Sequence, residues 1–251
     1  MKVVCIGAGN VATHLTKALF DAGYLIEQVV SRTEEHARGL AQAVNARWTT
    51  DFARIEEADL YIYSVSDAAL EEAIRRNPQT EGLHAHTAGS MSLTLFSGLK
   101  ERCGVLYPLQ TFSKEKPVDF GEVPLFVEAP CPDDLNILKQ LGADIGSKTF
   151  EADSLQRQQL HLAAVFACNF TNHLFAIADD LLKESGLPFD VLRPLIRETV
   201  EKTATLSPRE AQTGPAIRRD SNVMEKHLLK LSDHLQWQEI YRLLSENIQK
   251  Q

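Results

Sequence analysis

The sequence of 251 residues is poor in cysteine and has neither a long apolar run nor an excess of basic side chains. Its four cysteines lie far apart, without a C-x-x-C pair or a Cys/His cluster. This spacing excludes a zinc finger and a disulfide-stapled secreted domain, and we expect no metal site. The longest apolar run, Leu162–Cys168, has seven residues, whereas a membrane-spanning helix needs about 18.

Basic side chains are also fewer than acidic ones. There are 34 Asp and Glu against 26 Lys and Arg, which gives a net charge of −8. This sign is wrong for counterion-driven binding to nucleic acid. The first strand-like residues lead directly into Gly7, without the apolar core of a signal peptide. Together these absences predict a cytoplasmic protein with neither nucleic acid nor membrane as a partner.

The first half of the chain alternates short apolar runs with helical patterns, as βαβ units around a parallel sheet do. The expected strands are Lys2–Ile6, Ile26–Ser31, Asp59–Ser64, Leu83–Thr87, Gly104–Tyr107 and Pro124–Glu128. The expected helices are Val11–Ala22, Thr33–Val44, Asp67–Arg76, Leu93–Lys100 and Pro132–Leu141. This pattern predicts an α/β fold of the Rossmann class, a doubly wound parallel sheet.

The second half has no strand pattern. Its amphipathic stretches are Ser154–Ser185, Phe189–Leu206 and Asn222–Gln249, the last interrupted near Ser232–Gln236. The charge balance changes as well, because residues 1–152 carry 14 basic and 21 acidic side chains and residues 153–251 carry 12 and 13. We therefore expect a dinucleotide-binding domain over residues 1–152 and an all-helical domain over residues 153–251.

A glycine-rich turn follows the first expected strand. Residues Gly7, Ala8, Gly9, Asn10, Val11 and Ala12 form a G-x-G-x-x-A string between a strand and an amphipathic helix. In this context Gly7 permits a tight turn, Gly9 lets the backbone approach a pyrophosphate, and Ala12 lets the helix pack closely on the strand. The helix start offers free N–H groups and a positive dipole end. A dinucleotide site is the prediction, and a purely structural turn is the alternative.

The end of the second strand indicates which dinucleotide binds. NAD sites place Asp or Glu there to accept from the ribose 2′-OH, whereas this chain has Ser31, Arg32 and Thr33. A guanidinium between two hydroxyls suits a 2′-phosphate, since it binds phosphate through paired charged hydrogen bonds. NADP is favoured over NAD. A surface arginine at a strand end is the alternative interpretation.

Polar or small residues also follow two further strands, at the sheet edge where ligands bind in open α/β folds. They are Ser64, Val65 and Ser66 after one strand, and His86 and Thr87 at the end of the next. We expect these residues to line the cofactor crevice. Ser66 can equally serve as the N-cap of the following helix.

One expected helix carries polar side chains within an apolar stretch. At 100° per residue, His161 and Asn172 fall on one stripe and Asn169 lies about 80° from His161. Such groups must be hydrogen-bonded, either to neighbouring backbone or to a ligand. A second unusual stretch, Thr213–Asp220, contains Gly-Pro and then Arg218. It is either a loop with an Arg–Asp pair and an N-cap, or an anion-binding loop.

A Rossmann half followed by a helical half resembles the 6-phosphogluconate dehydrogenase-like superfamily, which includes ketopantoate reductase, pyrroline-5-carboxylate reductase and deazaflavin-dependent NADP oxidoreductases. Three strings, Tyr107–Ser113, His161–Asn169 and Thr213–Asp220, are more closely similar to a bacterial family within it. Members of that family are described as NADP oxidoreductases with a C-terminal domain of unknown function. The sequence is identified as a member of this family.

The sequence departs from these patterns at two places. Reductases of the superfamily commonly use a lysine and an asparagine one turn apart, or a threonine or serine hydroxyl, on the first helix of the helical domain. Here His161 stands where a lysine is expected, and no lysine lies between Thr149 and Ala178. The family also tends to have glycine where this chain has Arg219.

The resemblance implies an NADP-dependent oxidoreductase that transfers hydride between NADP(H) and a small, carboxylate-bearing carbonyl, imine or hydroxy compound. His161 is expected to act as general acid or base, because imidazole titrates near neutral pH. Asn169 and Asn172 would orient the reacting group, and Arg218 would hold the substrate anion. The helical domain often builds a dimer in this superfamily, so a homodimer is expected. The absent lysine keeps open a non-catalytic NADP-binding sensor or interaction protein.

Overall fold

The computed structural model describes residues 1–78 and 80–250, so residues 79 and 251 of the two expected domains lie outside the described part. The chain forms two compact units, Met1–Cys168 and Asn169–Gln251. They divide inside a long helix, whereas the boundary expected after residue 152 falls just before that helix begins. The assignment of dinucleotide binding to residues 1–152 and of a separate helical domain to residues 153–251 stays a prediction.

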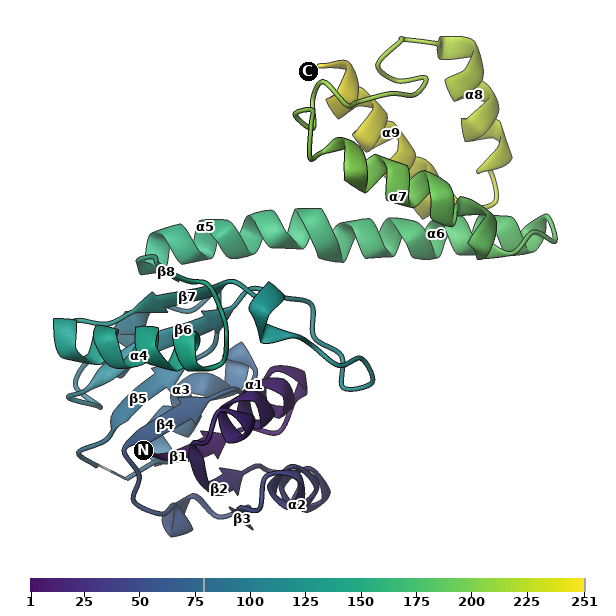
Figure 1. Ribbon diagram of the computed structural model, residues 1–251. Helices are drawn as coiled ribbons and strands as arrows, with labels where there is room; N and C mark the ends of the chain where they lie inside the picture. The colour runs from purple at the N-terminus through teal and green to yellow at the C-terminus, as the bar shows by residue number, and fades with distance from the viewer. Residues whose placement is uncertain (79, 251) are drawn as a thin grey trace. The chain divides into compact units, whose positions relative to one another are not determined.

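The first unit is built on a single sheet. Its strands are β1 (Lys2–Ile6), β2 (Leu25–Val30), β3 (Arg47–Thr49), β4 (Leu60–Tyr63), β5 (Leu83–His86), β6 (Cys103–Pro108), β7 (Leu125–Glu128) and β8 (Thr149–Glu151). Their order is β3-β2-β1-β4-β5-β6-β7-β8 (Figure 1), and β1 to β6 are parallel while β7 runs antiparallel to β6. The order reverses between β1 and β4, which places the ligand crevice of this fold at that point. The Rossmann class is confirmed.

Helices cover both faces of the sheet. The helices α1 (Asn10–Asp21), α2 (Glu34–Ala43) and α4 (Pro132–Asp144) bury apolar side chains on one face, and α3 (Asp67–Arg76) does so on the other. On α1, for example, Leu15 and Leu19 are fully buried against β1 and β2 residues. Burial of each such leucine side chain stabilises the folded state by about 1.5–3 kcal/mol. This packing holds the carboxyl ends of the parallel strands in a fixed row.

Three local predictions were wrong or incomplete. The strands β3 and β8 have three residues each, too few to show an alternating pattern, and they were missed. The helix expected over Leu93–Lys100 is only a short 3₁₀ turn, Leu93–Phe96. Gly98 follows with φ of +72°, a left-handed conformation that cannot continue a right-handed helix.

The helical half begins with α5 (Ser154–Ala164), which starts at a capping box formed by Asp153 and Gln156. A π-helical segment, Val165–Phe170, joins it to α6 (Thr171–Glu184). A 3₁₀ turn (Phe189–Leu192), α7 (Arg193–Lys202), α8 (Ser221–Lys230) and α9 (Leu235–Gln249) complete the second unit. The expected helices therefore form, with a π interruption that the sequence pattern did not predict.

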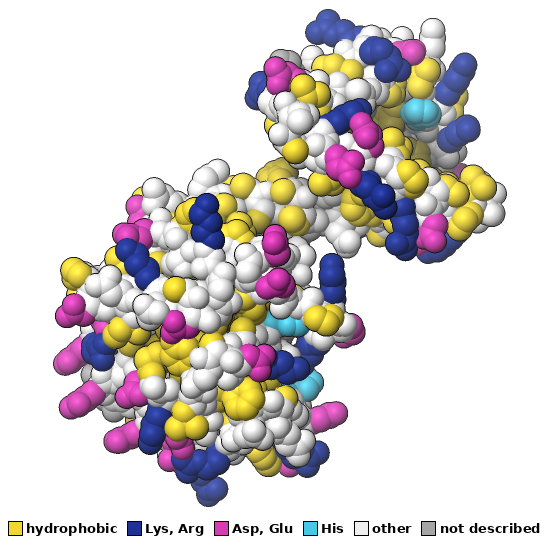
Figure 2. Space-filling view, viewed as in Figure 1, with side chains coloured by type: hydrophobic (Ala, Val, Ile, Leu, Met, Phe, Trp, Pro, Cys, Tyr) yellow, Lys and Arg dark blue, Asp and Glu magenta, His cyan; other side chains and the backbone are white. Residues whose placement is uncertain are grey.

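The run Ser154–Glu184 is the one helix among residues 1–78 and 80–250 that is long and apolar enough to cross a membrane. A single such helix is weak evidence for a membrane span, since core helices of other proteins pass the same test. No residue of its most apolar window is buried within this chain, and Figure 2 shows hydrophobic side chains exposed along it. This helix therefore presents an uncovered apolar face.

Candidate functional site

The glycine-rich turn joins β1 to α1 in a conformation that needs glycine. Gly7 has φ of +120°, and a Cβ added there would overlap the carbonyl oxygen of Ser64 at the end of β4. Gly9 differs, because nothing lies within 4 Å of the position its Cβ would take. The turn is thus packed tightly against the neighbouring strand at Gly7 and open at Gly9, as close approach of a pyrophosphate requires.

The first turn of α1 has free donors. Its N-cap, Gly9, provides no side-chain cap, and no acidic residue lies in the first turn. The Asn10 side chain is engaged elsewhere, since its Nδ2 donates to the Phe112 carbonyl at 2.9 Å. Backbone N–H groups at the helix start therefore remain to bind an anion, together with the positive helix end. Residues Ala8 to Ala12 fit a pyrophosphate through their backbone.

At the end of β2, Ser31 donates its backbone N–H to the Thr49 carbonyl at 3.2 Å, which fixes the corner. Arg32 is exposed and makes no ion pair with any residue in the described part of the chain. Thr33 is the N-cap of α2 and makes no side-chain cap bond. A free guanidinium and two hydroxyl side chains thus stand together at this corner, which fits a 2′-phosphate.

The next two strand ends contact each other. Thr87 Oγ1 donates to Ser64 Oγ at 3.2 Å, which joins the ends of β4 and β5. Val65 is half-buried and Ser66 is exposed. Ser66 occupies the N-cap position of α3, but its side chain makes no cap hydrogen bond. Ser66 therefore has the position of a cap residue while its hydroxyl remains available to a ligand.

His86 does not face the crevice. Its side chain is fully buried, stacks on Phe96 with ring centroids 5.7 Å apart, and accepts from the Ala88 backbone N–H through Nδ1 at 3.2 Å. Burial, and next the positive charge of Arg157, lowers the pKa of this imidazole to about 3. A direct cofactor contact would require the ring to leave this site. Its position at the strand end suggested the crevice, but the side chain points to the face that Phe96 covers.

His161 pairs with Tyr107, which was not among the predicted site residues. Its Nδ1 lies 3.0 Å from the hydroxyl of Tyr107, near the carboxyl end of β6, and the two rings meet edge to face. Gly89 lies against both, since a Cβ there would be 2.7 Å from His161 Nδ1 and 2.7 Å from Tyr107 Cζ. The one signal in the sequence was that Tyr107 ends an expected strand and begins the string Tyr107–Ser113.

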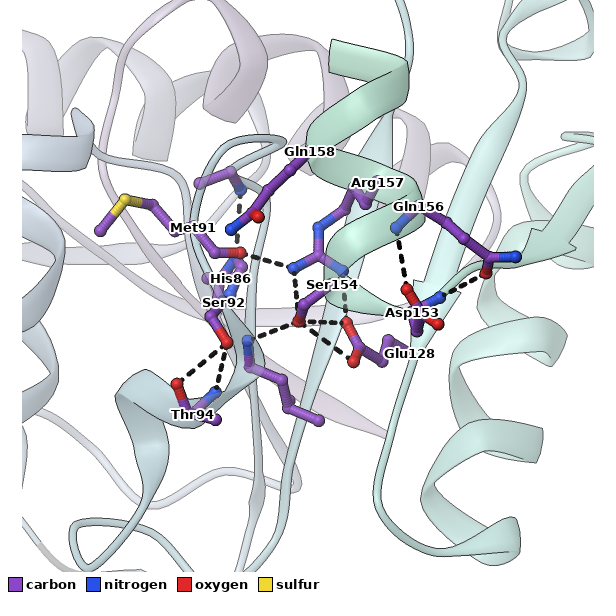
Figure 3. A network of polar contacts seen from close by, with 12 residues as sticks. His86, Met91, Ser92, Thr94, Glu128, Asp153, Ser154, Gln156, Arg157 and Gln158 are labelled. Atoms are coloured by element: carbon purple, nitrogen blue, oxygen red, sulfur yellow. Dashed lines mark hydrogen bonds and ion pairs between the residues drawn. The ribbon is translucent and has the colours of Figure 1, made fainter. Parts of the chain in front are cut away.

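The start of α5 is fixed to the sheet by a polar network (Figure 3). Arg157 is completely buried and forms an ion pair with Glu128 of β7, and it also donates to the Met91 carbonyl. Ser154 donates to Glu128, and Gln158 donates to the Ser90 carbonyl at 2.9 Å. These contacts come from one face of α5, at the spacing of successive turns. The same face carries His161, so the network sets the position of the imidazole.

The remaining site candidates lie in the second unit. Asn169 and Asn172 follow His161 across the π-helical segment, whose i→i+5 bonds change the angles that a uniform helix would give. Arg218 is exposed, with no ion pair to a described residue. Asp220 accepts from the Val223 N–H as N-cap of α8, and Arg219 has φ of +54°. Asp220 thus caps α8, and no Arg–Asp ion pair forms in this loop among the described residues, so an anion-binding role of Arg218 stays a prediction.

Two hollows of the surface lie away from these strand ends. One of about 970 Å³ lies at the opposite edge of the sheet, where Lys2, Asp59 and Gly82 precede or begin β1, β4 and β5. Another of about 560 Å³ lies beside α1, between His14 and the loop that contains Lys114. Ligands of open α/β folds bind at the carboxyl ends of the strands. The candidate site is therefore the row of residues at the carboxyl ends of the strands.

No cluster of three or more His, Cys, Asp or Glu that could hold a metal ion occurs in residues 1–78 and 80–250.

Comparison with known proteins agrees with this geometry. The family model described as "NADP oxidoreductase coenzyme F420-dependent" matches residues 2–84, and the model described as "Domain of unknown function (DUF2520)" matches residues 123–248. Among curated proteins, no significant match to the sequence is found.

Solved structures give both a close and several distant matches. The crystal structure of a "putative NADP oxidoreductase" from Bacteroides fragilis is 49% identical, with a TM-score of 0.93 and coverage of 100% of this chain and 98% of that one. A 1-pyrroline-5-carboxylate reductase from Streptococcus pyogenes is 14% identical, with a TM-score of 0.66 and coverage of 100% and 99%. An imine reductase from Pseudomonas sp. is 15% identical, with a TM-score of 0.62 and coverage of 96% and 87%. The last two show a shared fold.

Proposed function

The chain belongs to the family of NADP oxidoreductases whose C-terminal half is a domain of unknown function, and from this premise we propose that it transfers hydride between NADP(H) and a small, carboxylate-bearing compound. The compound is a carbonyl or imine in the reductive direction and a hydroxy compound or amine in the oxidative direction. That it is an oxidoreductase which binds NADP follows from the family. The substrate class and the residues that act on it are the proposal.

The observation that carries the proposal is the row of groups along the carboxyl edge of the sheet. Arg32 at the end of β2 would hold the 2′-phosphate, and the backbone from Gly7 to Ala12 after β1 would hold the pyrophosphate. The nicotinamide would then lie over the ends of β4 and β5, near Ser64 and Thr87, because the strands continue in that order. Next in the row is Tyr107 of β6, which is bonded to His161.

A bound NADPH supplies the hydride, and the protein provides orientation and a proton. His161 is suited to the proton step: its side chain is half-buried, and no described residue hydrogen-bonds to its Nε2. That nitrogen can donate a proton to the developing alkoxide of a carbonyl substrate or to the nitrogen of an imine substrate. In the reverse direction it can accept a proton. The imidazole thus takes the place of the lysine that related reductases use.

The carboxylate of the substrate is inferred from the second unit. Arg218 is exposed and makes no ion pair in the described part of the chain. A guanidinium binds a carboxylate through two parallel hydrogen bonds, which also fixes its orientation. Asn169 and Asn172 add carboxamides that can bond the reacting group. We assign Arg218 to substrate binding and the two asparagines to orientation.

A homodimer and a cytoplasmic location complete the proposal. Within the described residues of the second unit, only Ala216, Leu231 and Ser245 are buried, too few to form a core. A second copy would cover the apolar side chains that remain exposed. All four cysteines are free thiols, as is usual in a reducing compartment.

The experiment that tests the cofactor site is a thermal shift measurement with NADPH, NADP⁺, NADH and no ligand. A ligand at 100 times its Kd adds about 2.7 kcal/mol to the stability of the folded state. We expect a clear rise in Tm with the phosphorylated dinucleotides and a smaller one with NADH. Arg32→Ala should weaken NADPH binding about 10- to 100-fold, the value of a charged bidentate contact, and leave NADH binding unchanged.

Arg209→Ala, which removes another exposed arginine, is the matched control and should behave as wild type. Equal loss of NADPH and NADH binding in Arg32→Ala would remove Arg32 from the 2′-phosphate site. The absence of a shift with any dinucleotide would overturn the proposal. A screen of 2-oxo acids and cyclic imino acids for NADPH oxidation then tests the substrate class, and Arg218→Ala should raise KM for any acid that is reduced.

A further inference from the structure

The contact between Tyr107 and His161 is more specific than packing alone requires. Both belong to the first unit, yet they lie 54 residues apart, on β6 and on α5. Their ring centroids are 6.0 Å apart at an interplanar angle of 72°, which points the hydroxyl at Nδ1 rather than stacking the rings. Tyr107 is nearly buried, at 8% exposure, and the hydroxyl makes no other hydrogen bond among the described residues.

The surroundings preserve this contact from three directions. Gly89 leaves the space that the pair needs, since any β-carbon there would approach both rings to 2.7 Å. Arg157, one turn before His161, anchors α5 through Glu128 and the Met91 carbonyl. Gln158 adds a bond to the Ser90 carbonyl, next to Gly89. The helix and the loop are therefore held so that the imidazole meets the phenol.

The bond has a preferred direction. Burial raises the pKa of Tyr107, and the nearby charge of Arg157 lowers it by less, so the phenol keeps its proton near neutral pH. A phenolic O–H is a stronger donor than the N–H of a neutral imidazole. With neutral His161 the hydroxyl therefore donates to Nδ1, and the ring proton resides on Nε2.

We propose that Tyr107 is the positioning residue of His161: its hydroxyl donates to Nδ1, holds the neutral imidazole in the Nε2–H form and fixes the ring so that Nε2 can give its proton to the substrate. This inference rests on the proposed role of His161 as acid and base. In the reductive direction, hydride from NADPH adds to the C=O or C=N carbon while the π-electron pair moves to oxygen or nitrogen. That atom takes the Nε2 proton while Nδ1 takes the proton of the Tyr107 hydroxyl, so the imidazole stays neutral. The phenolate left near the positive charge of Arg157 regains a proton from solvent. The products are NADP⁺ and the hydroxy or amino acid.

The test is imidazole ¹⁵N NMR of the full chain labelled in histidine, which needs no substrate. The chain has eight histidines, and loss of one set of signals in His161→Gln assigns those of His161. In the wild type we expect an Nε2–H imidazole whose unprotonated Nδ1 shows the shift of a hydrogen-bond acceptor. Tyr107→Phe keeps the ring and removes only the hydroxyl, so Nδ1 should move to the position of an unbonded nitrogen and the other tautomer should appear.

Gly89→Ala gives an independent variant, because its methyl group would wedge between the two rings and should produce the same change. Tyr24→Phe is the matched control. It also removes a hydroxyl bonded to another side chain, Asp144, at the opposite edge of the sheet, and it should leave the His161 signals unchanged. A proton on Nδ1 in the wild type, or an unchanged Nδ1 resonance in Tyr107→Phe, would overturn the inference.

Thermal shifts with NADPH separate this outcome from failure of the proposed function. If Tyr107→Phe keeps the wild-type NADPH shift while the tautomer result is negative, only the role of Tyr107 fails. If neither the wild type nor any variant shows a thermal shift with a dinucleotide, the proposed function itself fails. With an acid found to be reduced, Tyr107→Phe should lower kcat about 10-fold or more and leave KM for NADPH unchanged.

Discussion

Two imidazoles buried in the first unit make its stability sensitive to acid. His84 is fully buried, lies 2.9 Å from the Tyr63 hydroxyl through Nδ1 and 2.9 Å from Thr80 Oγ1 through Nε2, and stacks on Tyr61. Burial, followed by the charge of Lys100, lowers its pKa to about 3. Burial lowers the pKa of His86 in the same way, also to about 3. Both rings are therefore neutral in the folded protein near neutral pH.

We expect stability to fall as the pH is lowered from about 6.5 toward about 3. In this window the unfolded chain binds protons at His84 and His86 and the folded chain does not, so each imidazole contributes a slope of up to about 1.4 kcal/mol per pH unit. Urea unfolding followed by circular dichroism at several pH values measures it. His84→Gln should be less stable at pH 7 because it loses hydrogen bonds, yet show a shallower pH slope.

His36→Gln is the control for this prediction, because His36 is exposed on α2. Its pH slope should match that of the wild type. An identical slope in His84→Gln would show that the loss of stability in acid has another origin.

At the level of single residues, the sequence predicted backbone requirements better than side-chain partners. The G-x-G-x-x-A string predicted the tight turn, and Gly7 has the positive φ that such a turn needs. Glycine at the position of Arg219 is explained in the same way, since this residue has φ of +54°. By contrast, the contact of Tyr107 with His161 joins distant parts of the chain, and no local pattern encodes it. The burial of His86 was missed because strand alternation does not show which face is covered.

At the level of elements, the helix α5 depends on a buried ion pair. Arg157 is wholly buried and Glu128 largely so, with side-chain exposures of 0% and 17%. Removing one partner of a buried pair leaves an uncompensated charge, which costs about 3–5 kcal/mol. We expect Arg157→Met to lower the free energy of unfolding by this amount. Chemical denaturation measures the loss, and hydrogen exchange should show faster opening of residues 154–161 and 88–93.

Arg75→Met is the matched control, since Arg75 forms an exposed pair with Glu71 on α3. Exposed pairs contribute about 0–1 kcal/mol, so this variant should be nearly as stable as the wild type. Adding Glu128→Met to Arg157→Met should recover part of the lost stability, because no unpaired charge then remains. Equal effects of Arg157→Met and Arg75→Met would contradict the structural role of the buried pair.

Elements with long, regular patterns were predicted from the sequence, and short or irregular ones were not. The limits of α3 were predicted to the residue, Asp67–Arg76, because its apolar spacing and polar ends agree. The edge strand β3 could not be found, since three residues with an exposed Trp48 carry no periodic signal. The π-helical segment Val165–Phe170 was invisible for another reason: apolar residues continue through it without a break.

At the level of the whole molecule, the helical half leaves apolar side chains exposed within this chain. Large side chains are exposed on several helices, among them Leu195 at 63%, Leu229 at 73%, Leu235 at 69% and Leu243 at 69%. Isolated exposed leucines are ordinary on protein surfaces, but a set of this size with almost no buried core is not. Obligate homodimers show such faces because their core is divided between two copies.

We therefore expect a dimer in solution, of about twice the 28.0 kDa of one chain, in sedimentation equilibrium or light scattering. Leu195→Glu combined with Leu243→Glu should produce monomers or reduce Tm strongly, because burying two carboxylates in the interface is costly. Lys226→Glu, which places a carboxylate at an exposed polar position of α8, should leave the mass unchanged. Because dimer formation stabilises the folded state by mass action, Tm of the wild type should also rise with protein concentration. A monomeric wild type with a concentration-independent Tm would show that these leucines are covered within one chain or by a different molecule.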